Sequence, residues 1–141
     1  MTDVLKTARS FMSALPHAQV LGMQIIDLGD GRATVTMPWD SRFVGDPVTG
    51  VLHGGAVSAL MDTASGAAVM CHPSAPASTA TLGLRIDYMR PATPGQSITA
   101  RAVCHHVTRN VAFVRVTATD ADIARPVAMG TGTFTLDRPA R

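Results

Sequence analysis

Residues 53–70 read HGGAVSALMDTASGAAVM, and this stretch decides the fold. Nearly all of its residues are Ala, Gly, Val, Leu, Met or Ser, and its length and composition predict a helix over residues 54–70. A helix that is apolar on every side is expected to be buried on every side. Its small side chains let neighbouring strands approach the helix axis closely. The sequence therefore predicts one central helix that the rest of the chain surrounds.

Shorter elements are expected before the central helix. Residues 1–16 predict an amphipathic N-terminal helix that ends at its proline, because proline cannot continue a helix. Residues 20–28 and 31–38 predict a β-hairpin, with Gly29-Asp30-Gly31 as its turn. Residues 39–53 are rich in Gly and Pro and predict a loop that leads into the central helix.

The second half of the chain predicts strands. Four segments rich in Thr, Val and Ile are separated by short turns: residues 78–89, 96–107, 110–119 and 126–136. Strands that follow one another through short turns favour an antiparallel sheet. A single sheet curled around one helix supplies the cover which that helix needs. We therefore predict one α+β domain over residues 1–141, an antiparallel sheet wrapped around the long central helix.

The amino-acid composition indicates which kinds of binding partner the protein has. Hydrophobic residues make up 46% of the chain and charged residues only 16%, against about 25% charged residues in average proteins. So few charges on a small domain predict that part of its surface is buried against another copy, although a monomer with ordinary apolar exposure is the alternative. The net charge is +2, with one Trp, one Tyr and no basic run, which argues against a nucleic-acid partner.

The sequence also predicts a cytoplasmic protein without a metal site. Cys71 and Cys104 form no CxxC pair, and residues 1–13 lack the apolar core of a secretion signal. No segment reaches the roughly 18 apolar residues that a membrane span needs. His105 and His106 are neighbours on a predicted strand, so they point to opposite faces and make a poor chelate.

The glycine pair at the start of the central helix is the first candidate for chemistry. The first turn of a helix has free N–H groups and a partial positive charge, and glycine lets a ligand oxygen approach the backbone closely. Gly54 and Gly55 therefore fit an oxyanion site. The alternative is that the pair only forms the turn into the helix.

Asp62 and His53 are the next candidates. Asp62 lies in the middle of an apolar helix, where a carboxylate costs free energy unless it has partners. It is either functional or a structural Asp that pairs with an Arg or with the backbone. His53 can hydrogen-bond the adjoining loop or contact a substrate carbonyl, and we favour an orienting role.

Helix geometry separates these two groups. Gly55 and Asp62 are seven residues apart, or roughly 10 Å along a helix axis. An amide and a carboxylate that act on one carbonyl must lie within a few ångströms of that carbonyl. Two antiparallel copies of the helix, side by side, satisfy this requirement. The sequence thus favours a site at a two-fold interface.

Four segments resemble one family. They are residues 45–55, Leu60 to Gly66, Thr81 to Ala92 and Ala128 to Phe134, and together they resemble the hotdog thioesterases of the phenylacetic-acid pathway (PaaI-like) over roughly residues 18–137. The resemblance implies the hotdog fold, dimers with a continuous sheet, and often dimers of dimers. It also implies hydrolysis of acyl-CoA or aryl-CoA thioesters without a metal or cofactor.

The resemblance also implies roles for individual residues. Asp62 matches the catalytic acid, acting as nucleophile or as general base on water. Gly55 matches the amide that polarises the thioester carbonyl, and His53 matches the histidine that supports this loop. Thr81 falls where members often have a Ser or Thr that helps to hold the nucleophilic water. Asp46 stands where the family often has Asn, and an ionised Asp cannot donate a hydrogen bond.

Further substrate contacts are expected around these groups. Gly54 and Leu82 adjoin the matched positions, and Arg90 is the first candidate for the phosphates of CoA, followed by Arg85 and Arg109. Five apolar side chains are candidates for the acyl pocket: Leu21, Met23, Phe43, Met61 and Leu82. The sequence does not distinguish a fatty chain from an aromatic ring.

Two other functions compete with thioester hydrolysis. Some hotdog proteins are hydratases or dehydratases of acyl thioesters, but the chain lacks the His-Phe-Pro and Asp-x-Asn-x-x-His settings of their catalytic histidine. An acyl-CoA-binding sensor would need an attached DNA-binding or partner domain, for which 141 residues leave no room. Thioester hydrolysis is therefore the leading hypothesis.

Overall fold

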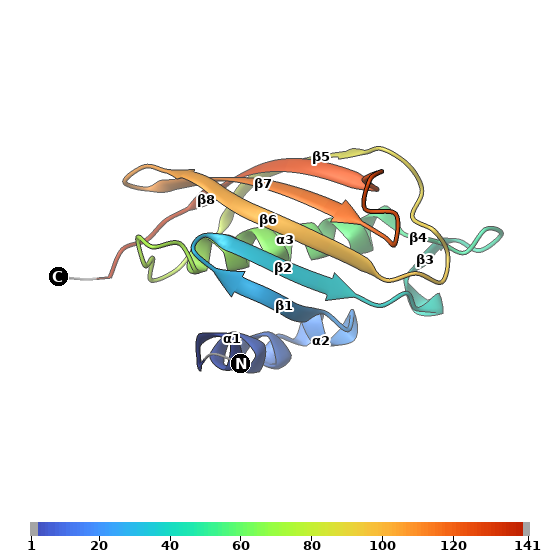
Figure 1. The fold of residues 1–141 in the computed structure, drawn as a ribbon, viewed down its shortest axis with the longest axis horizontal. Helices are drawn as coiled ribbons and strands as arrows, with labels where there is room; N and C mark the ends of the chain where they lie inside the picture. Colours follow the sequence, from blue (N-terminus) through green and yellow to red (C-terminus); the bar gives the residue numbers. More distant parts are fainter. Residues whose placement is uncertain (1–2, 140–141) are drawn as a thin grey trace.

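A six-stranded antiparallel sheet lies over one long helix, α3 (Figure 1). The computed structural model describes residues 3–139, so the outermost residues of the predicted domain 1–141 and of the predicted helix 1–16 lie outside the description. The elements follow in this order: α1 Asp3–Ala14, α2 Pro16–Val20, β1 Gln24–Gly29, β2 Arg32–Met37, the 3-10 turn Ser41–Phe43, β3 Val44–Asp46, β4 Val51–Leu52, α3 Gly54–Met70, β5 Thr81–Tyr88, β6 Ile98–Val107, β7 Val111–Thr119 and β8 Ala128–Thr135. The predicted α+β architecture, a sheet against one long helix, is confirmed.

The sheet has the strand order β1-β2-β6-β7-β8-β5. Its strands alternate between buried residues, which face α3, and more exposed residues on the outer face. Many of the buried residues are small, so the sheet approaches the helix closely: Ala100, Ala102, Ala112, Ala118, Gly130 and Gly132. A Cβ atom on Gly130 would lie 3.0 Å from the Arg85 carbonyl oxygen, so this position excludes larger residues.

The sheet covers only one side of α3. Val57, Leu60, Met61 and Ala64 are buried on that side, whereas the opposite side is half-buried or exposed along residues 54–70. The prediction that α3 is buried on every side is therefore wrong for the single chain, because one sheet layer cannot enclose a helix. The apolar composition of α3 predicts that both of its sides are buried, but it does not identify what buries the second side.

The N-terminal region differs from its prediction in one respect. The first helix ends at Ala14, as its following proline requires, but a second short helix, α2, begins at Pro16. Proline suits the first position of a helix because its fixed φ fits and the N–H it lacks has no helical partner there. The first strand consequently starts at Gln24 and not at residue 20.

The predicted loop 39–53 contains a short hairpin, β3–β4. Gly45 lies so close to His53 that a Cβ atom on Gly45 would be 2.7 Å from the His53 Cα atom. The His53 N–H donates to the Phe43 carbonyl across 2.8 Å. These contacts fix the residue that precedes α3.

The two edges of the sheet differ. Helix α1 lies beside β1 (Figure 1), and the Arg9 side chain donates to the Ile25 carbonyl across 3.0 Å. At the other edge, β5 pairs with β8 on one side and with no strand of residues 3–139 on its other side. Large apolar side chains are exposed near this open edge: Leu82, Tyr88, Met89 and Met129.

Two further findings concern the environment of the chain. Among residues 3–139, no helix combines the length and the apolar character that crossing a membrane requires. Both cysteines are free thiols.

Candidate active site

The first turn of α3 is capped by its own histidine. His53 is the N-cap residue, and its Nδ1 atom accepts a hydrogen bond from the Gly55 N–H across 2.8 Å. The His53 carbonyl accepts from the N–H of Ala56 at 3.0 Å. Among residues 3–139, no hydrogen-bond partner is found for the Gly54 N–H. The amide that is free to bind a ligand oxygen is therefore that of Gly54, whereas the predicted donor, Gly55, is engaged by His53.

Tyr88 closes the other side of this turn. Its hydroxyl donates to the Gly54 carbonyl across 2.6 Å, and a Cβ atom on Gly54 would lie 3.5 Å from the tyrosine ring. Tyr88 lies within the segment Thr81 to Ala92 that resembles the family, but no role is predicted for it from the sequence. The contact joins residues 34 apart, so no local pattern indicated it.

Asp62 lies about two helical turns further along α3 than Gly54, on the side that the sheet leaves uncovered. The Thr81 hydroxyl donates to the Asp62 Oδ1 atom across 2.7 Å, and Asp62 is half-buried. No partner for the Oδ2 atom is found among the described residues. The structure thus brings two of the predicted site residues, Asp62 and Thr81, into direct contact.

Asp46 and Leu82, two other predicted site residues, are exposed. The Asp46 carboxylate accepts from the Thr49 hydroxyl at 2.8 Å and from the Val48 N–H at 3.0 Å. These hydrogen bonds, that of Thr49 first, hold the pKa of the Asp46 carboxyl below its ordinary value. Asp46 is therefore an ionised acceptor that shapes its own loop. Leu82 lies at an irregularity in the pairing of β5 with β8.

The guanidinium of Arg90, the first candidate for a CoA contact, is held inside the chain. It donates to both carboxylate oxygens of Asp120, at 2.6 and 2.8 Å, and to the Arg125 carbonyl at 2.8 Å. The Arg90 side chain is 18% exposed and that of Asp120 is 0% exposed. The hydrogen bonds of Arg90 hold the pKa of Asp120 well below its usual range, against the opposing effect of burial. This pair is an internal brace between the turn after β5 and the segment before β8.

The other predicted contacts are dispersed. Arg85 lies on the outer face of the sheet, where it pairs weakly with Asp87 at 3.4 Å. Arg109 is exposed in the turn between β6 and β7. Four of the five candidate pocket residues belong to the buried core of the chain and not to an open pocket: Leu21, Met23, Phe43 and Met61.

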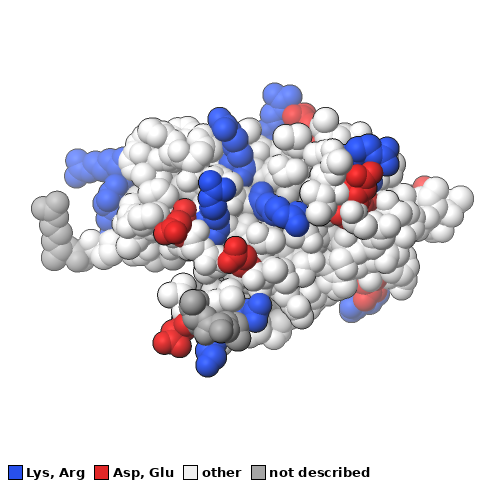
Figure 2. Space-filling view, in the orientation of Figure 1, with Lys and Arg blue, Asp and Glu red and all other residues white. Residues whose placement is uncertain are grey.

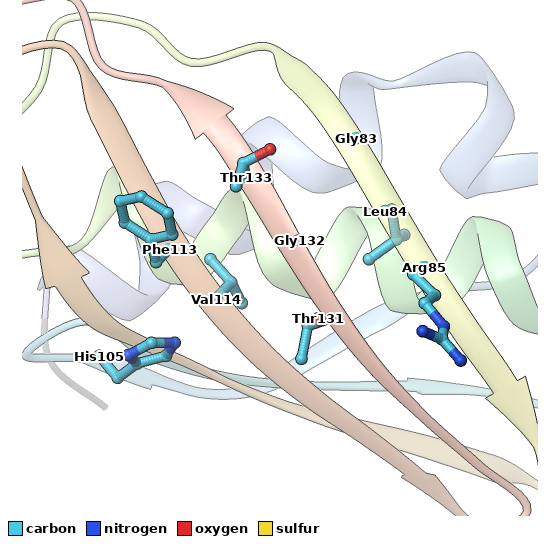
Figure 3. A pocket seen from close by; sticks show the side chains of 9 residues that line it. All are labelled: Gly83, Leu84, Arg85, His105, Phe113, Val114, Thr131, Gly132 and Thr133. Carbon is cyan, nitrogen blue, oxygen red and sulfur yellow. The ribbon is translucent and has the colours of Figure 1, made fainter.

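Two surface hollows lie away from Asp62. One, of about 460 Å³, is on the outer face of the sheet and is open to solvent (Figure 3); its lining residues are Gly83, Leu84, Arg85, His105, Phe113, Val114, Thr131, Gly132 and Thr133. The other lies at Arg109, Asn110, Leu136, Asp137 and Arg138. Neither of these two hollows includes Asp62 or Gly54 among its lining residues. Within residues 3–139, no three His, Cys, Asp or Glu side chains gather in a metal-binding arrangement.

A family model described as the thioesterase superfamily matches residues 49–127, which include all of α3 and β5. The chain belongs to the thioesterase superfamily. The matched segment spans His53, the glycine pair, Asp62, Thr81 and Tyr88, and it begins three residues after Asp46.

Individual relatives and a solved structure agree with this assignment. The chain is 35% identical over 142 aligned positions to a putative esterase of Halobacterium salinarum, covering 96% of this chain and 94% of that one. It is 34% identical to the acyl-coenzyme A thioesterase PaaI of Escherichia coli over 63% of this chain and 60% of that one. A solved structure of a Pseudomonas aeruginosa protein superposes with a TM-score of 0.82 at 40% identity, covering 94% and 98% of the two chains. The chain is thus a PaaI-like thioesterase with the hotdog fold.

Proposed function

We propose that the protein hydrolyses acyl-CoA or aryl-CoA thioesters to the free acid and CoA. The observation that carries the proposal is the placement of Asp62 on the open side of α3, with the Thr81 hydroxyl on one carboxylate oxygen. Membership of the thioesterase superfamily and the likeness to the acyl-coenzyme A thioesterase of Escherichia coli support the substrate class.

The carboxylate of Asp62 activates the water that attacks the thioester. Thr81 fixes the Oδ1 atom, and a water that bridges the Thr81 hydroxyl and the Oδ2 atom would be oriented for attack. Asp62 takes the proton of this water as the new C–O bond forms at the thioester carbon. The C–S bond then breaks, and the CoA thiolate leaves and takes up a proton. Direct attack by Asp62, through an anhydride that water opens, is the alternative route with the same products.

The first turn of α3 supplies the oxyanion site. The Gly54 N–H belongs to the first residue of α3 and has no hydrogen-bond partner among residues 3–139, and the partial positive charge of the helix N-terminus favours a developing oxyanion. The Gly55 N–H, our first candidate from the sequence, becomes available only when the His53 ring turns away from it. We therefore assign Gly54 as the donor and His53 as the residue that orients the turn.

A second copy of the chain completes the site. Gly54 and Asp62 are eight residues apart, or roughly 12 Å along one helix, so the carbonyl held by one α3 is within reach of an Asp62 from an antiparallel partner helix. The uncovered side of α3 and the open edge of β5 offer an adjoining surface for that copy. We propose a homodimer, or a dimer of dimers, built on this surface.

The outer face of the sheet is less suited to self-association. One register row across the sheet places Arg32, Arg115 and Arg85 on β2, β7 and β5, and all three are exposed. Figure 2 shows basic side chains over the middle of the sheet. Because two such faces would repel each other, charge favours pairing through α3 and β5.

Arg90 is left out of the proposed substrate contacts because its donors are bound to Asp120 and to backbone carbonyls. Leu82, exposed on the open edge, remains a proposed contact for the acyl or pantetheine part. We also propose a cytoplasmic location, which the free thiols of both cysteines suit.

The test is thiol release from a panel of acyl-CoA and aryl-CoA substrates. The wild-type protein should release CoA from at least one class, and Asp62→Asn should lower kcat by about a thousandfold or more while the protein stays folded. Asp87→Asn is the matched control, because it removes an exposed carboxylate from β5 that pairs with Arg85 at 3.4 Å. Turnover by Asp62→Asn equal to that of Asp87→Asn would refute the assignment, as would hydration of an unsaturated acyl-CoA without CoA release.

A further inference from the structure

One peptide group in the site is held from both ends. The Gly54 carbonyl accepts the Tyr88 hydroxyl across 2.6 Å, and the Gly55 N–H donates to His53 Nδ1 across 2.8 Å. The carbonyl and the N–H belong to the same peptide group. Because this peptide lies in the first turn of α3, the two side chains add to the helical backbone in fixing the plane of the Gly54–Gly55 peptide.

Such fixation matters because both residues are glycines. A peptide between two glycines meets little steric resistance to rotation. A flip would turn the Gly54 carbonyl oxygen toward the N-terminal end of α3, where the oxyanion of the reaction would form. A carbonyl oxygen at that point would repel the developing negative charge, whereas the fixed orientation keeps only N–H groups there.

Tyr88 is itself well anchored. The N–H of Met89, the next residue, donates to the Val127 carbonyl across 2.8 Å. Arg90 then forms its ion pair with the buried Asp120 at 2.6 Å. The end of β5 is thus braced against the segment before β8, and the tyrosine hydroxyl is held at the first turn of α3. The side chain is also 51% exposed, so burial of the ring does not account for its position.

We infer that Tyr88 is a positioning residue of the thioesterase site: with His53 it fixes the Gly54–Gly55 peptide, and so keeps the N-terminal turn of α3 in the orientation that stabilises the oxyanion. This inference rests on the proposed function. A hydroxyl bound to the Gly54 carbonyl also polarises the peptide, which strengthens the Gly55 N–H as a donor to His53.

The variant Tyr88→Phe tests the inference because it removes only the hydroxyl. We expect kcat for thioester hydrolysis to fall roughly tenfold, the equivalent in rate of about one hydrogen bond, with KM changed by less than about twofold. Exchange of the Gly55 amide hydrogen, followed by NMR, should become several-fold faster, since the peptide is released at one end. Thr131→Val, which removes an exposed hydroxyl from the outer face of β8, is the control and should match the wild type in both measurements.

The outcomes separate this inference from the proposed function. If the wild type hydrolyses thioesters and Tyr88→Phe behaves like Thr131→Val in kcat, the positioning role is overturned while the thioesterase assignment stands. An equal loss in kcat/KM that comes entirely from KM would also overturn it. If the wild type hydrolyses no thioester, the proposed function fails. In that case the peptide-fixing role is tested by amide hydrogen exchange alone, and it is overturned if the Gly55 amide of Tyr88→Phe exchanges at the wild-type rate.

Discussion

The Thr81 hydroxyl and the Asp62 carboxylate are joined by a hydrogen bond of 2.7 Å that links the edge strand β5 to the central helix. Asp62 is half-buried on the side of α3 that the sheet leaves open. The bond holds one carboxylate oxygen in place. It offsets part of the free-energy cost of placing a carboxylate in a largely apolar helix.

Thr81 should contribute to rate through its hydroxyl. Thr81→Val keeps the shape of the side chain but removes the donor to Asp62, so we expect kcat to fall by about tenfold to a hundredfold. Thr81→Ser retains a hydroxyl and should stay within about threefold of the wild type. Steady-state thiol release measures both variants, and a fully active Thr81→Val protein would show that this bond has no part in catalysis.

His53 should act as a cap and not as a proton donor or base. Asn accepts a hydrogen bond at an N-cap as His53 does, whereas Ala cannot. His53→Asn should therefore retain most of the activity, while His53→Ala should lose at least about tenfold in kcat and about 1 kcal/mol of stability. Denaturant unfolding and thiol release give the two quantities. Equal loss of activity in both variants would instead indicate that the imidazole itself takes part in the chemistry.

Gly45 should be required by the backbone of the site. A Cβ atom there would lie 2.7 Å from the Cα atom of His53, and neither backbone can move without shifting the helix start. Gly45→Ala should lower the free energy of unfolding by about 1–3 kcal/mol and reduce activity. Gly83→Ala is the control, since the nearest atom to its Cβ is a Thr133 hydroxyl at 3.8 Å. Similar unfolding midpoints for the two variants would contradict this packing argument.

The brace between Arg90 and Asp120 should set the acid stability. The pKa of Asp120 is lowered in the folded state, chiefly by hydrogen bonds from Arg90, so the pair stabilises the protein above the unfolded value of about 4. That stability is lost as the pH falls below about 4 toward the lower folded pKa. Asp120→Asn should cost about 3 kcal/mol near neutral pH and progressively less as the pH falls through that window. Urea unfolding at a series of pH values tests this, and a cost that does not change with pH would contradict it.

The sequence was sufficient for the helix and strands that repeat a clear pattern. The range of α3 was predicted correctly from composition, and the strands from their Thr, Val and Ile content. Helix α2 and the β3–β4 hairpin were missed because they are too short to show a period and depend on contacts such as that of Gly45 with His53.

Contacts between distant residues set the remaining limits. Arg90 was a reasonable phosphate ligand by charge, but its partner Asp120 is 30 residues away, and no local pattern connects them. Likewise, the sequence pattern does not indicate that the Gly55 N–H is hydrogen-bonded to the His53 ring, which is why Gly55 and not Gly54 is the donor expected from the sequence. The residue types in the site were readable from the sequence, whereas the atoms left free by internal hydrogen bonds required the structure.

The most direct measurement uses hybrid oligomers of two catalytically impaired variants, Asp62→Asn and His53→Ala, which are unfolded together and refolded as a mixture. If one copy supplies the carboxylate and the other the oxyanion turn, half of the random dimers regain one intact site of two, so thiol release should recover to about a quarter of the wild-type rate. Release that stays at the mean of the two separately refolded variants would contradict a site shared between two copies of the chain.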